Sequence, residues 1–385
     1  MALSVTSILL VAVISIFIAS GVFSKAQYLE PWQKSYSDKF DDPRIKLAAH
    51  GLLAANGHNM QPWKIKLDSD KNVFYLYADS ERLTKEVDPY ARQTMVTQGT
   101  FLEYVRVAGE KLGYKTDINL FPDGEYDEQN LEESMKTKPV AKITLTKTEP
   151  QSNSLYDYMF LPDTNRGAYK NQELTPEEMR QLLAINTDSD MALEIFQDET
   201  NKNNLGQYAI EGAIIESGIH RINEEFAKIF RANEYQKNKY RYGFSVEGQG
   251  TIGIMKHVMQ GLITLFPSMN NEKASANLYV KSTQTAVDNT PAYAMIITKD
   301  NSRTQQVKSG MLYSRLVLTA HSLGLVMQPP SQVLEEYPEM NEQYTKIHES
   351  YAPNGGTIQM FFRIGQPTQE FPNSMRRDVM DLIVK

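Results

Sequence analysis

The sequence predicts an α+β fold made of two related halves in one chain, preceded by one N-terminal transmembrane helix. Residues 2–23 form an apolar run without a charged side chain. The chain has 385 residues, which is too many for one small core and indicates two domains or two fused halves. A long apolar segment with the same spacing of Val, Gly, Leu and Gly occurs twice, so the halves are expected to be copies of one architecture.

Composition excludes several classes of function. A hydrophobic content of 41% and a charged content of 23% are typical of a folded globular protein. The net charge of −7 argues against a nucleic-acid partner. The chain has no cysteine, which excludes disulfides, thiolate metal sites and Cys nucleophiles but does not decide the compartment. The six histidines show no HxxxH or HxH spacing, so the sequence predicts no metal site.

The first segment, residues 1–24, is expected to be a membrane anchor. A helix that rises about 1.5 Å per residue can span a bilayer of about 30 Å with residues 2–23. A cleaved signal peptide is one alternative, because residues 24–26 offer a small-residue cleavage site. A buried core helix is a second alternative, which the length of the run and its place at a chain end disfavour. No Lys or Arg precedes Lys25, which favours the uncleaved anchor. Acidic and basic residues mix after the run, so the side of the membrane stays open, and a cleaved chain would be secreted.

A polar linker, residues 25–42, leads to the first half, residues 43–150. Its pattern predicts a helix, two paired strands, a long apolar helix that ends at Gly113, and a strand. In that order, these elements cover residues 43–55, 64–67, 72–78, 94–114 and 140–149.

The second half, residues 151–385, begins with a helix that Thr175 caps, with Pro176 at its first position and two acidic residues behind. A longer amphipathic helix, a strand, a second long apolar helix and a strand follow. The elements of this half cover residues 175–185, 205–232, 292–300, 310–325 and 357–365. Between them, residues 233–273 are irregular and rich in Tyr, Met and Gly, and form a possible lid insertion.

An internal repeat relates the two halves. Val96, Gly99, Leu112 and Gly113 of the first long helix match, at one constant offset, Val307, Gly310, Leu323 and Gly324 of the second. The order strand, helix, strand recurs around both helices. Because both helices are apolar on several faces, they are expected to pack together as the interface of an internal pseudo-dimer, which makes the chain a monomer.

A loop dense in side-chain donors precedes the first strand, where residues 57–67 read GHNMQPWKIKL. Pro62 favours an extended Gln61, and Trp63 is expected to enter the core. The preceding loop is then left with exposed donors that could hold a planar polar ligand. On the residues alone, a structural turn whose Asn and Gln satisfy their own backbone is the stronger interpretation.

Three further clusters have both a functional and a structural interpretation. Arg166 lies in DTNRGAY, residues 163–169, where a lone Arg is usually solvated. Arg376 and Arg377 can clamp a phosphate as a pair, or form a basic tail that faces acidic neighbours. Residues 328–332, QPPSQ, form a rigid loop when taken alone.

Taken together, the four clusters resemble those of a known family. NGHNMQPW resembles the PSxxNxQPW loop of the nitroreductase flavoproteins. The order of segments resembles their tandem branch, the Acg-like FMN-binding proteins, in which two nitroreductase-like halves share one chain. Residues 88–114 are similar to its DPxGRE…LGy segment, TNRGAY to its TNRxxF, and RIGQP…RR to its closing motif. The resemblance runs from about residue 43 to the C-terminus.

The resemblance implies one FMN per chain, bound between the halves. The loop of the first half approaches the isoalloxazine, while the second half holds the phosphate and lies near the ring nitrogen N5. The cofactor-binding residues implied are Asn56, Gly57, Asn59 and Gln61 for the loop, Arg166, Arg376 and Arg377 for the phosphate, and Ser331 and Gln332 near N5. Asn56 and Gly57 stand where the family often has Ser, which weakens hydroxyl contacts to the flavin.

The function implied is an FMN-dependent oxidoreductase that passes a hydride from NAD(P)H through FMN to a nitro, quinone or unknown small-molecule acceptor. No catalytic side chain is assigned, because the flavin carries the chemistry and the sequence shows no convincing acid–base pair. The alternative is a non-catalytic protein that stores or sequesters FMN beneath a lid at residues 233–273. A scaffold that has lost the cofactor is a third interpretation.

Overall fold

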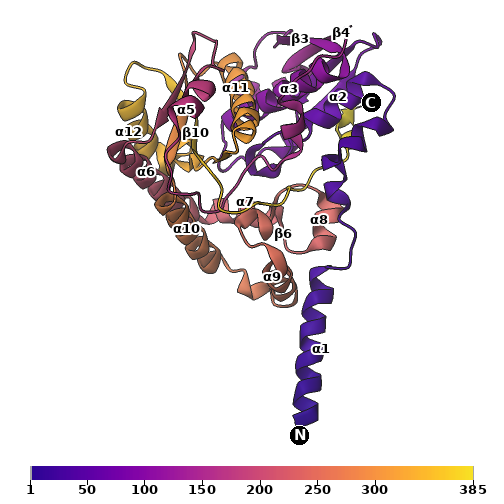
Figure 1. The fold of residues 1–385 in the computed structure, drawn as a ribbon, viewed down its shortest axis with the longest axis vertical. Coiled ribbons are helices and arrows are strands. Elements are labelled where there is room, and N and C mark those ends of the chain that lie inside the picture. The colour runs from indigo at the N-terminus through magenta and orange to yellow at the C-terminus, as the bar shows by residue number, and fades with distance from the viewer. Residues whose placement is uncertain (1, 385) are drawn as a thin grey trace.

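The computed structural model describes residues 2–384, with side chains from residue 6 onward. Met1 and Lys385, at the outer ends of the predicted segments 1–24 and 151–385, lie outside the described residues. Two α+β units lie side by side, and helix α1 extends away from them, as Figure 1 shows.

The first unit contains a sheet covered by α2 and α3. Its elements are α2 (Pro43–Gly51), β1 (Trp63–Leu67), β2 (Val73–Ala78), α3 (Arg92–Leu112), β3 (Tyr114–Leu120), α4 (Leu131–Thr137) and β4 (Ala141–Lys147). Asp42 caps α2 by accepting from the Arg44 amide, with Pro43 at the first helical position. Gly113 ends α3 with a left-handed φ of 80°. The predicted elements of this half are present, and β3 is an additional strand.

The second unit contains a four-stranded sheet and a long helical insertion. Its strands and long helix are β5 (Met191–Phe196), β8 (Ala292–Thr298), α11 (Arg303–Ser322), β9 (Val326–Gln328) and β10 (Thr357–Gly365), with α5 (Pro176–Leu183) before them and α12 (Asn341–Tyr351) before β10. The insertion holds α6 (Glu199–Ser217), α7 (His220–Ile229), β6 (Phe230–Arg231), α8 (Glu234–Tyr240), β7 (Phe244–Ser245), α9 (Gly253–Leu265) and α10 (Glu272–Asp288).

Both sheets have the same strand order. The first runs β1-β2-β4-β3 and the second β5-β8-β10-β9, with every neighbouring pair antiparallel. Along the chain, α3 and α11 each follow the second strand of their sheet, and α4 and α12 each precede the fourth. The two units therefore have one topology, and residues 197–291 are the main difference between them.

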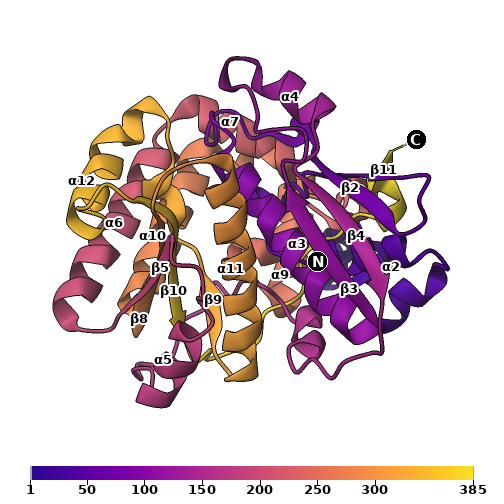
Figure 2. The ribbon, with the colours of Figure 1, turned by 90° about the horizontal axis from the view of Figure 1, so that it is seen from above.

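The long helices α3 and α11 cross in close contact between the two sheets (Figure 2). At the crossing, a Cβ on Gly99 would lie 1.8 Å from the Val307 carbonyl oxygen, and a Cβ on Gly310 would lie 1.8 Å from that of Val96. These are the residues of the sequence repeat, now facing each other in a reciprocal way. Only glycine allows two helix backbones to approach this closely.

The C-terminal tail returns from the second unit to the first. Strand β11 (Ile383–Val384) pairs in parallel with β1 at the edge of the first sheet. Val379 and Leu382 are buried in the core of the first unit. The tail brings Arg376 and Arg377 to the loop before β1, which is remote from them in sequence.

The N-terminal anchor is a wrong prediction. No helix within residues 2–384 is long and apolar enough to cross a membrane, so neither a transmembrane helix nor a single-pass membrane location is supported. Helix α1 (Ala2–Ser20) stops short of residue 23, because Gly21 takes a left-handed φ of 75°. The last turns of α1 pack on α9, where a Cβ on Gly261 would lie 2.1 Å from the Ile16 carbonyl oxygen.

Three other expectations differ from the structure. Residues 233–273, expected to be irregular, contain the helices α8 and α9. The predicted helix at 205–232 is two helices, α6 and α7, which separate at Gly218. Residues 25–42, expected to be a polar linker, form two 3₁₀ turns, Gln27–Trp32 and Lys34–Lys39. Tyr28, Trp32 and Tyr36 of these turns are buried. Their apolar rings outweigh the charged residues that made the segment look like a linker.

Candidate functional site

The loop before β1 has an unusual backbone. His58, Asn59 and Gln61 have φ values of 51°, 53° and 52°, in the left-handed region that residues other than glycine seldom adopt. The predicted extended conformation of Gln61 is therefore wrong. The loop is held by Asn56, whose Oδ1 accepts from the Gln61 amide at 2.8 Å, and by the Gly57 amide, which donates to Thr97 Oγ1 at 3.1 Å.

The side-chain amides of the loop bind other backbone segments. Asn59 Nδ2 donates to the carbonyls of Gly243 at 3.3 Å and Met375 at 3.2 Å. Gln61 Nε2 donates to the carbonyl of Arg241 at 2.8 Å, and Gln61 is completely buried. The loop thus joins the insertion on one side to the C-terminal tail on the other.

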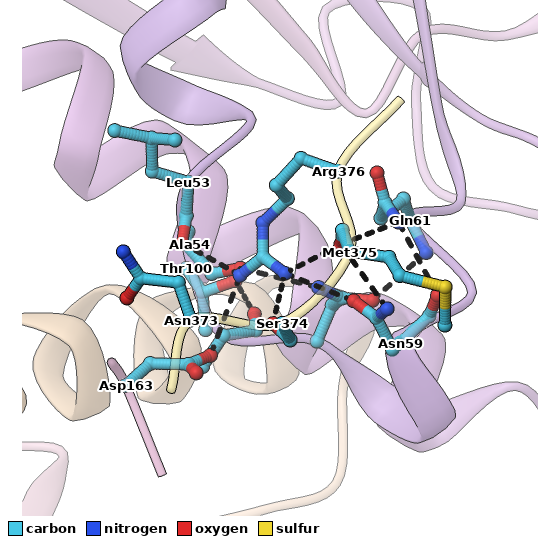
Figure 3. Close-up of polar contacts among 12 residues, drawn as sticks. Leu53, Ala54, Asn59, Gln61, Thr100, Asp163, Asn373, Ser374, Met375 and Arg376 are labelled. Atoms are coloured by element: carbon cyan, nitrogen blue, oxygen red, sulfur yellow. Dashed lines mark hydrogen bonds and ion pairs between the residues drawn. The ribbon is translucent and has the colours of Figure 1, made fainter. Parts of the chain in front are cut away.

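Arg376 lies at the centre of this junction (Figure 3). It is fully buried and donates to the carbonyls of Leu53 at 2.8 Å and Ala54 at 3.1 Å, and to Asn59 Oδ1 at 2.9 Å. Its remaining ionic partner is Asp163, at 3.6 Å. Burial lowers the pKa of Arg376, an effect that the charge of Asp163 opposes. Only Nε is without a partner within residues 2–384, so little of this guanidinium is left for a ligand.

Arg377 is engaged in the same way. Its amide donates to Gln61 Oε1 at 2.8 Å, and its guanidinium donates to the carbonyls of Gln61 at 3.2 Å and Asp381 at 2.7 Å. Burial, followed by the nearby charge of Arg82, lowers the pKa of Arg377 to about 10. Arg377 therefore holds the tail against the loop.

Arg166 differs from both. Its side chain is exposed, and no hydrogen bond or ion pair holds it within residues 2–384. Desolvation nevertheless lowers the pKa of Arg166, and Tyr279 and then Asp163, both of the second unit, oppose that effect most. The charge of Arg166 also acts on His58 of the loop. An accessible cation therefore lies within electrostatic reach of the first unit's loop.

His58 is the only loop side chain with an unsatisfied buried nitrogen, Nε2, among the described residues. Burial, and then the charge of Arg166, lowers its pKa to about 4, so the ring is neutral at pH 7. The ring packs at a tilt against Phe226 of α7 and edge-to-face against Phe244 of β7, with centroids 5.2 and 5.7 Å away. A cavity of about 10 Å³ beside it, also lined by Thr97, has room for one water molecule.

Ser331 and Gln332 lie on a separate turn, Ser331–Leu334, within the second unit. Ser331 Oγ donates to the Phe361 carbonyl at 2.8 Å, and Gln332 packs against Gly212 of α6. Gln93 of α3 connects this turn to the loop, because its Nε2 donates to Glu335 at 3.3 Å and its side chain lies beside Gly57. The predicted site residues thus form two groups, bridged by Gln93.

The structure also contains an acid pair that the sequence interpretation missed. Glu216 and Glu335 are buried, with exposed fractions of 2% and 3%, and their carboxyl groups contact each other. A sequence signal was available for Glu216, which stands at helical spacing in the apolar stripe of α6 that contains Leu205, Ala209 and Ala213. The corresponding signal for Glu335 is absent, because it lies in an irregular segment.

Comparisons with known proteins gave a likeness in fold only. No family model and no curated protein matches this sequence. Among solved structures, a nitroreductase with bound FMN from Desulfitobacterium hafniense is 15% identical, with a TM-score of 0.34, and covers 61% of this chain and 99% of its own. The FMN-dependent nitroreductase of Mycobacterium smegmatis in complex with NADPH is 13% identical, with a TM-score of 0.30, and covers 54% and 84%.

A nitroreductase with bound FMN from Bacteroides fragilis is 11% identical, with a TM-score of 0.34, and covers 59% of this chain and 96% of its own. All three neighbours are nitroreductase-like flavoproteins, and their likeness to this chain is distant. Membership of the tandem branch stays a prediction.

Proposed function

We propose that this chain binds one FMN between its two units and acts as an oxidoreductase of the nitroreductase type. The observation that carries the proposal is Arg166, an accessible guanidinium without a partner in the described residues, beside the loop of the other unit. A charged donor that no protein group uses is suited to a phosphate. The motif order NGHNMQPW, TNRGAY and RIGQP…RR supports the same assignment.

The side chains present fit the cofactor in part. Arg166 offers the phosphate its charge, and the orphaned His58 Nε2 and the buried hydroxyls of Tyr104 and Tyr313, which lack partners in residues 2–384, offer polar contacts nearby. Arg376 and Arg377 fit a different role. Their donors are used within the chain, so we assign them to the support of the loop and leave the phosphate to Arg166.

When bound, FMN would supply hydride transfer between NAD(P)H and a nitro, quinone or other acceptor. The protein would bind and orient the ring through His58 Nε2 of the fixed loop, since the amides of Asn59 and Gln61 are already bound to backbone carbonyls. Phe226 and Phe244 would exclude water on the side of the insertion. Because both units of the interface belong to one chain, we further propose a functional monomer, which sedimentation would test.

A spectrum of the purified chain tests the proposal. The expected result is a flavin absorbance that is bleached by NADPH or NADH without air and restored by a quinone. Arg166→Ala should lose the flavin and stay folded. A colourless protein that does not take up added FMN would refute the proposal.

A second function is favoured by the contacts that the insertion makes with the first unit at the loop before β1. The Gly243 amide donates to the Asn59 carbonyl at 3.0 Å, and Arg82 stacks on Tyr242 with 4.4 Å to the ring centroid. A loop sealed in this way would suit a protein that sequesters FMN without turnover. A yellow chain that dithionite reduces, but NADPH and NADH do not, would favour sequestration over catalysis.

A further inference from the structure

Glu216 and Glu335 form a pair of buried carboxyl groups at the junction of several elements. Glu216 comes from α6, and Glu335 follows the turn Ser331–Leu334. Glu216 Oε1 and Glu335 Oε2 each lack a partner in residues 2–384, although the two groups contact each other. A proton shared between the carboxyl groups would satisfy both.

The charges around the pair favour retention of that proton. Burial raises the pKa of both carboxyl groups, and the charge of Glu216 raises that of Glu335 further. Asp88, before α3, acts in the same direction. Arg92 of α3 opposes them, but two of its nitrogens are bound to the carbonyls of Gln359 at 2.7 Å and Leu334 at 2.8 Å. Its Nε faces the carboxylate of Glu336 at 3.4 Å.

The other groups that face the pair are neutral donors or distant acids. Gln93 of α3 donates to Glu335, Tyr279 of α10 contacts Glu216, and Tyr337 lies beside Glu335. Glu339 raises the pKa of Tyr337 and is not among the groups that act on Glu216 or Glu335. No cation within the described residues forms an ion pair with Glu216 or Glu335, so two negative charges in contact would be very costly here.

The pair is one part of a row of protonatable groups. At the inner end, Tyr279 contacts Glu216 and is the first side chain that opposes the lowering of the Arg166 pKa by burial. At the outer end, Tyr337 lines an open surface pocket of about 620 Å³ together with Glu339. The row thus runs from the wall of this pocket, where Tyr337 is itself buried, to Tyr279, which acts on the pKa of Arg166.

We propose that Glu216 and Glu335 hold a shared proton and deliver it through Tyr279 to an acceptor bound beside Arg166. This inference rests on the proposed function, because reduction of a quinone by two electrons consumes one hydride, supplied by the flavin, and one proton. The Tyr279 O–H bond breaks as a new O–H bond forms on the acceptor oxygen. In the same step Glu216 gives the one proton that it shares with Glu335 to the Tyr279 oxygen, which leaves the pair without a proton.

Solvent restores the proton through the surface pocket that Tyr337 lines. The transfers are concerted, since burial raises the pKa of Tyr279 far above its ordinary value and an isolated tyrosinate would be strongly disfavoured. Glu216 and Glu335 are positioning residues in this scheme, and Tyr279 is the donor.

Infrared spectra of the full chain, compared between wild type and variants, test the shared proton independently of turnover. At neutral pH we expect a carbonyl band of a protonated carboxyl group that Glu216→Gln and Glu335→Gln each remove. Glu342→Gln is the matched control, because Glu342 is an exposed carboxylate paired with Lys346, and it should leave the band unchanged. A wild-type chain without the band would overturn the proposal.

Turnover tests delivery of the proton. With 1,4-benzoquinone as the probe, Tyr279→Phe should slow quinone reduction by roughly 10²-fold, as for loss of a general acid, while reduction by NADPH is unchanged. Both Gln variants should lose the pH dependence of quinone reduction without loss of bound flavin. Wild-type rates and pH profiles in all three variants would overturn the delivery step. If the chain retains no flavin, the proposed function and the delivery step both fall, and the infrared band still decides the shared proton.

Discussion

Arg376 and Arg166 are the most informative pair of positions at which to substitute alanine. Arg376→Ala would remove the donors to Leu53, Ala54 and Asn59, and a fourth to the Met375 carbonyl at 3.0 Å. Each such bond from a charged donor is worth about 1.5–3 kcal/mol. The variant no longer desolvates a guanidinium, which offsets part of the loss. Removing one partner of a buried charged network usually costs about 3–5 kcal/mol, and we expect a destabilisation in that range.

Arg166→Ala should behave differently, because Arg166 is exposed and has no partner in residues 2–384. Its free energy of unfolding should stay within about 0.5 kcal/mol of wild type. Arg376→Lys should recover only part of the loss, since an ammonium cannot reproduce the planar set of donors.

Urea unfolding followed by tryptophan fluorescence measures these differences. Trp32 is a local reporter, because the Arg376 guanidinium lies over its ring, 4.6 Å from the centroid. Flavin content, measured on the same samples, separates support of the loop from contact with phosphate. An Arg376→Ala variant within about 1 kcal/mol of wild type would refute the assignment of Arg376 to the junction.

Three further predictions concern packing, acid stability and the insertion. Gly310→Ala places a Cβ 1.8 Å from the Val96 carbonyl oxygen, so α3 and α11 must separate, and urea unfolding should show a loss of at least about 2 kcal/mol. Burial alone would raise the pKa of Glu234, but Lys237 and neighbouring donors lower it to about 2 from 4.5. Its folded-state pKa is depressed, so this stability is complete above pH 4.5 and lost as the pH falls towards 2; thermal melts should show less acid loss in Glu234→Gln. Phe244→Ala should release β7 from His58 and speed limited proteolysis of the insertion several-fold.

Each of these predictions has a control. Gly248→Ala should stay within about 0.5 kcal/mol of wild type, because no atom lies closer than 3.4 Å to the added Cβ. Glu342→Gln serves for the acid melts, since its carboxylate is exposed. A fully stable Gly310→Ala variant, an unchanged acid profile in Glu234→Gln, or an unchanged cleavage rate in Phe244→Ala would contradict the respective argument.

Local signals in the sequence were sufficient for much of the fold. Thr175 caps α5 as the motif predicted, with Glu178 completing a capping box, and α2 begins at Pro43 as expected. Gly113 ends α3 because glycine readily adopts a left-handed φ. These features depend on residues within one or two turns of each other, which a pattern along the chain records.

The predictions that failed depend on what packs against a segment. Residues 2–23 read as an anchor, and only the folded chain shows a shorter helix whose end rests on α9. Residues 25–42 read as a linker, and the structure buries three of their aromatic rings. Burial of a segment depends on residues that are remote in sequence, and the hydropathy of the segment itself does not reveal which residues will cover it.

The sequence by itself determined the α+β class, the repeated long helices with Gly99 and Gly310, and the cluster of donors before β1. Only the tertiary structure decided which donors remain free. Arg376 donates to backbone carbonyls of the first unit, while the Arg166 guanidinium has no hydrogen-bond partner in residues 2–384. The tertiary structure also brought Glu216 and Glu335 into contact. The physical reason is that hydrogen-bond partners and shared protons are set by distances between remote segments, which leave no periodic trace in the order of residues.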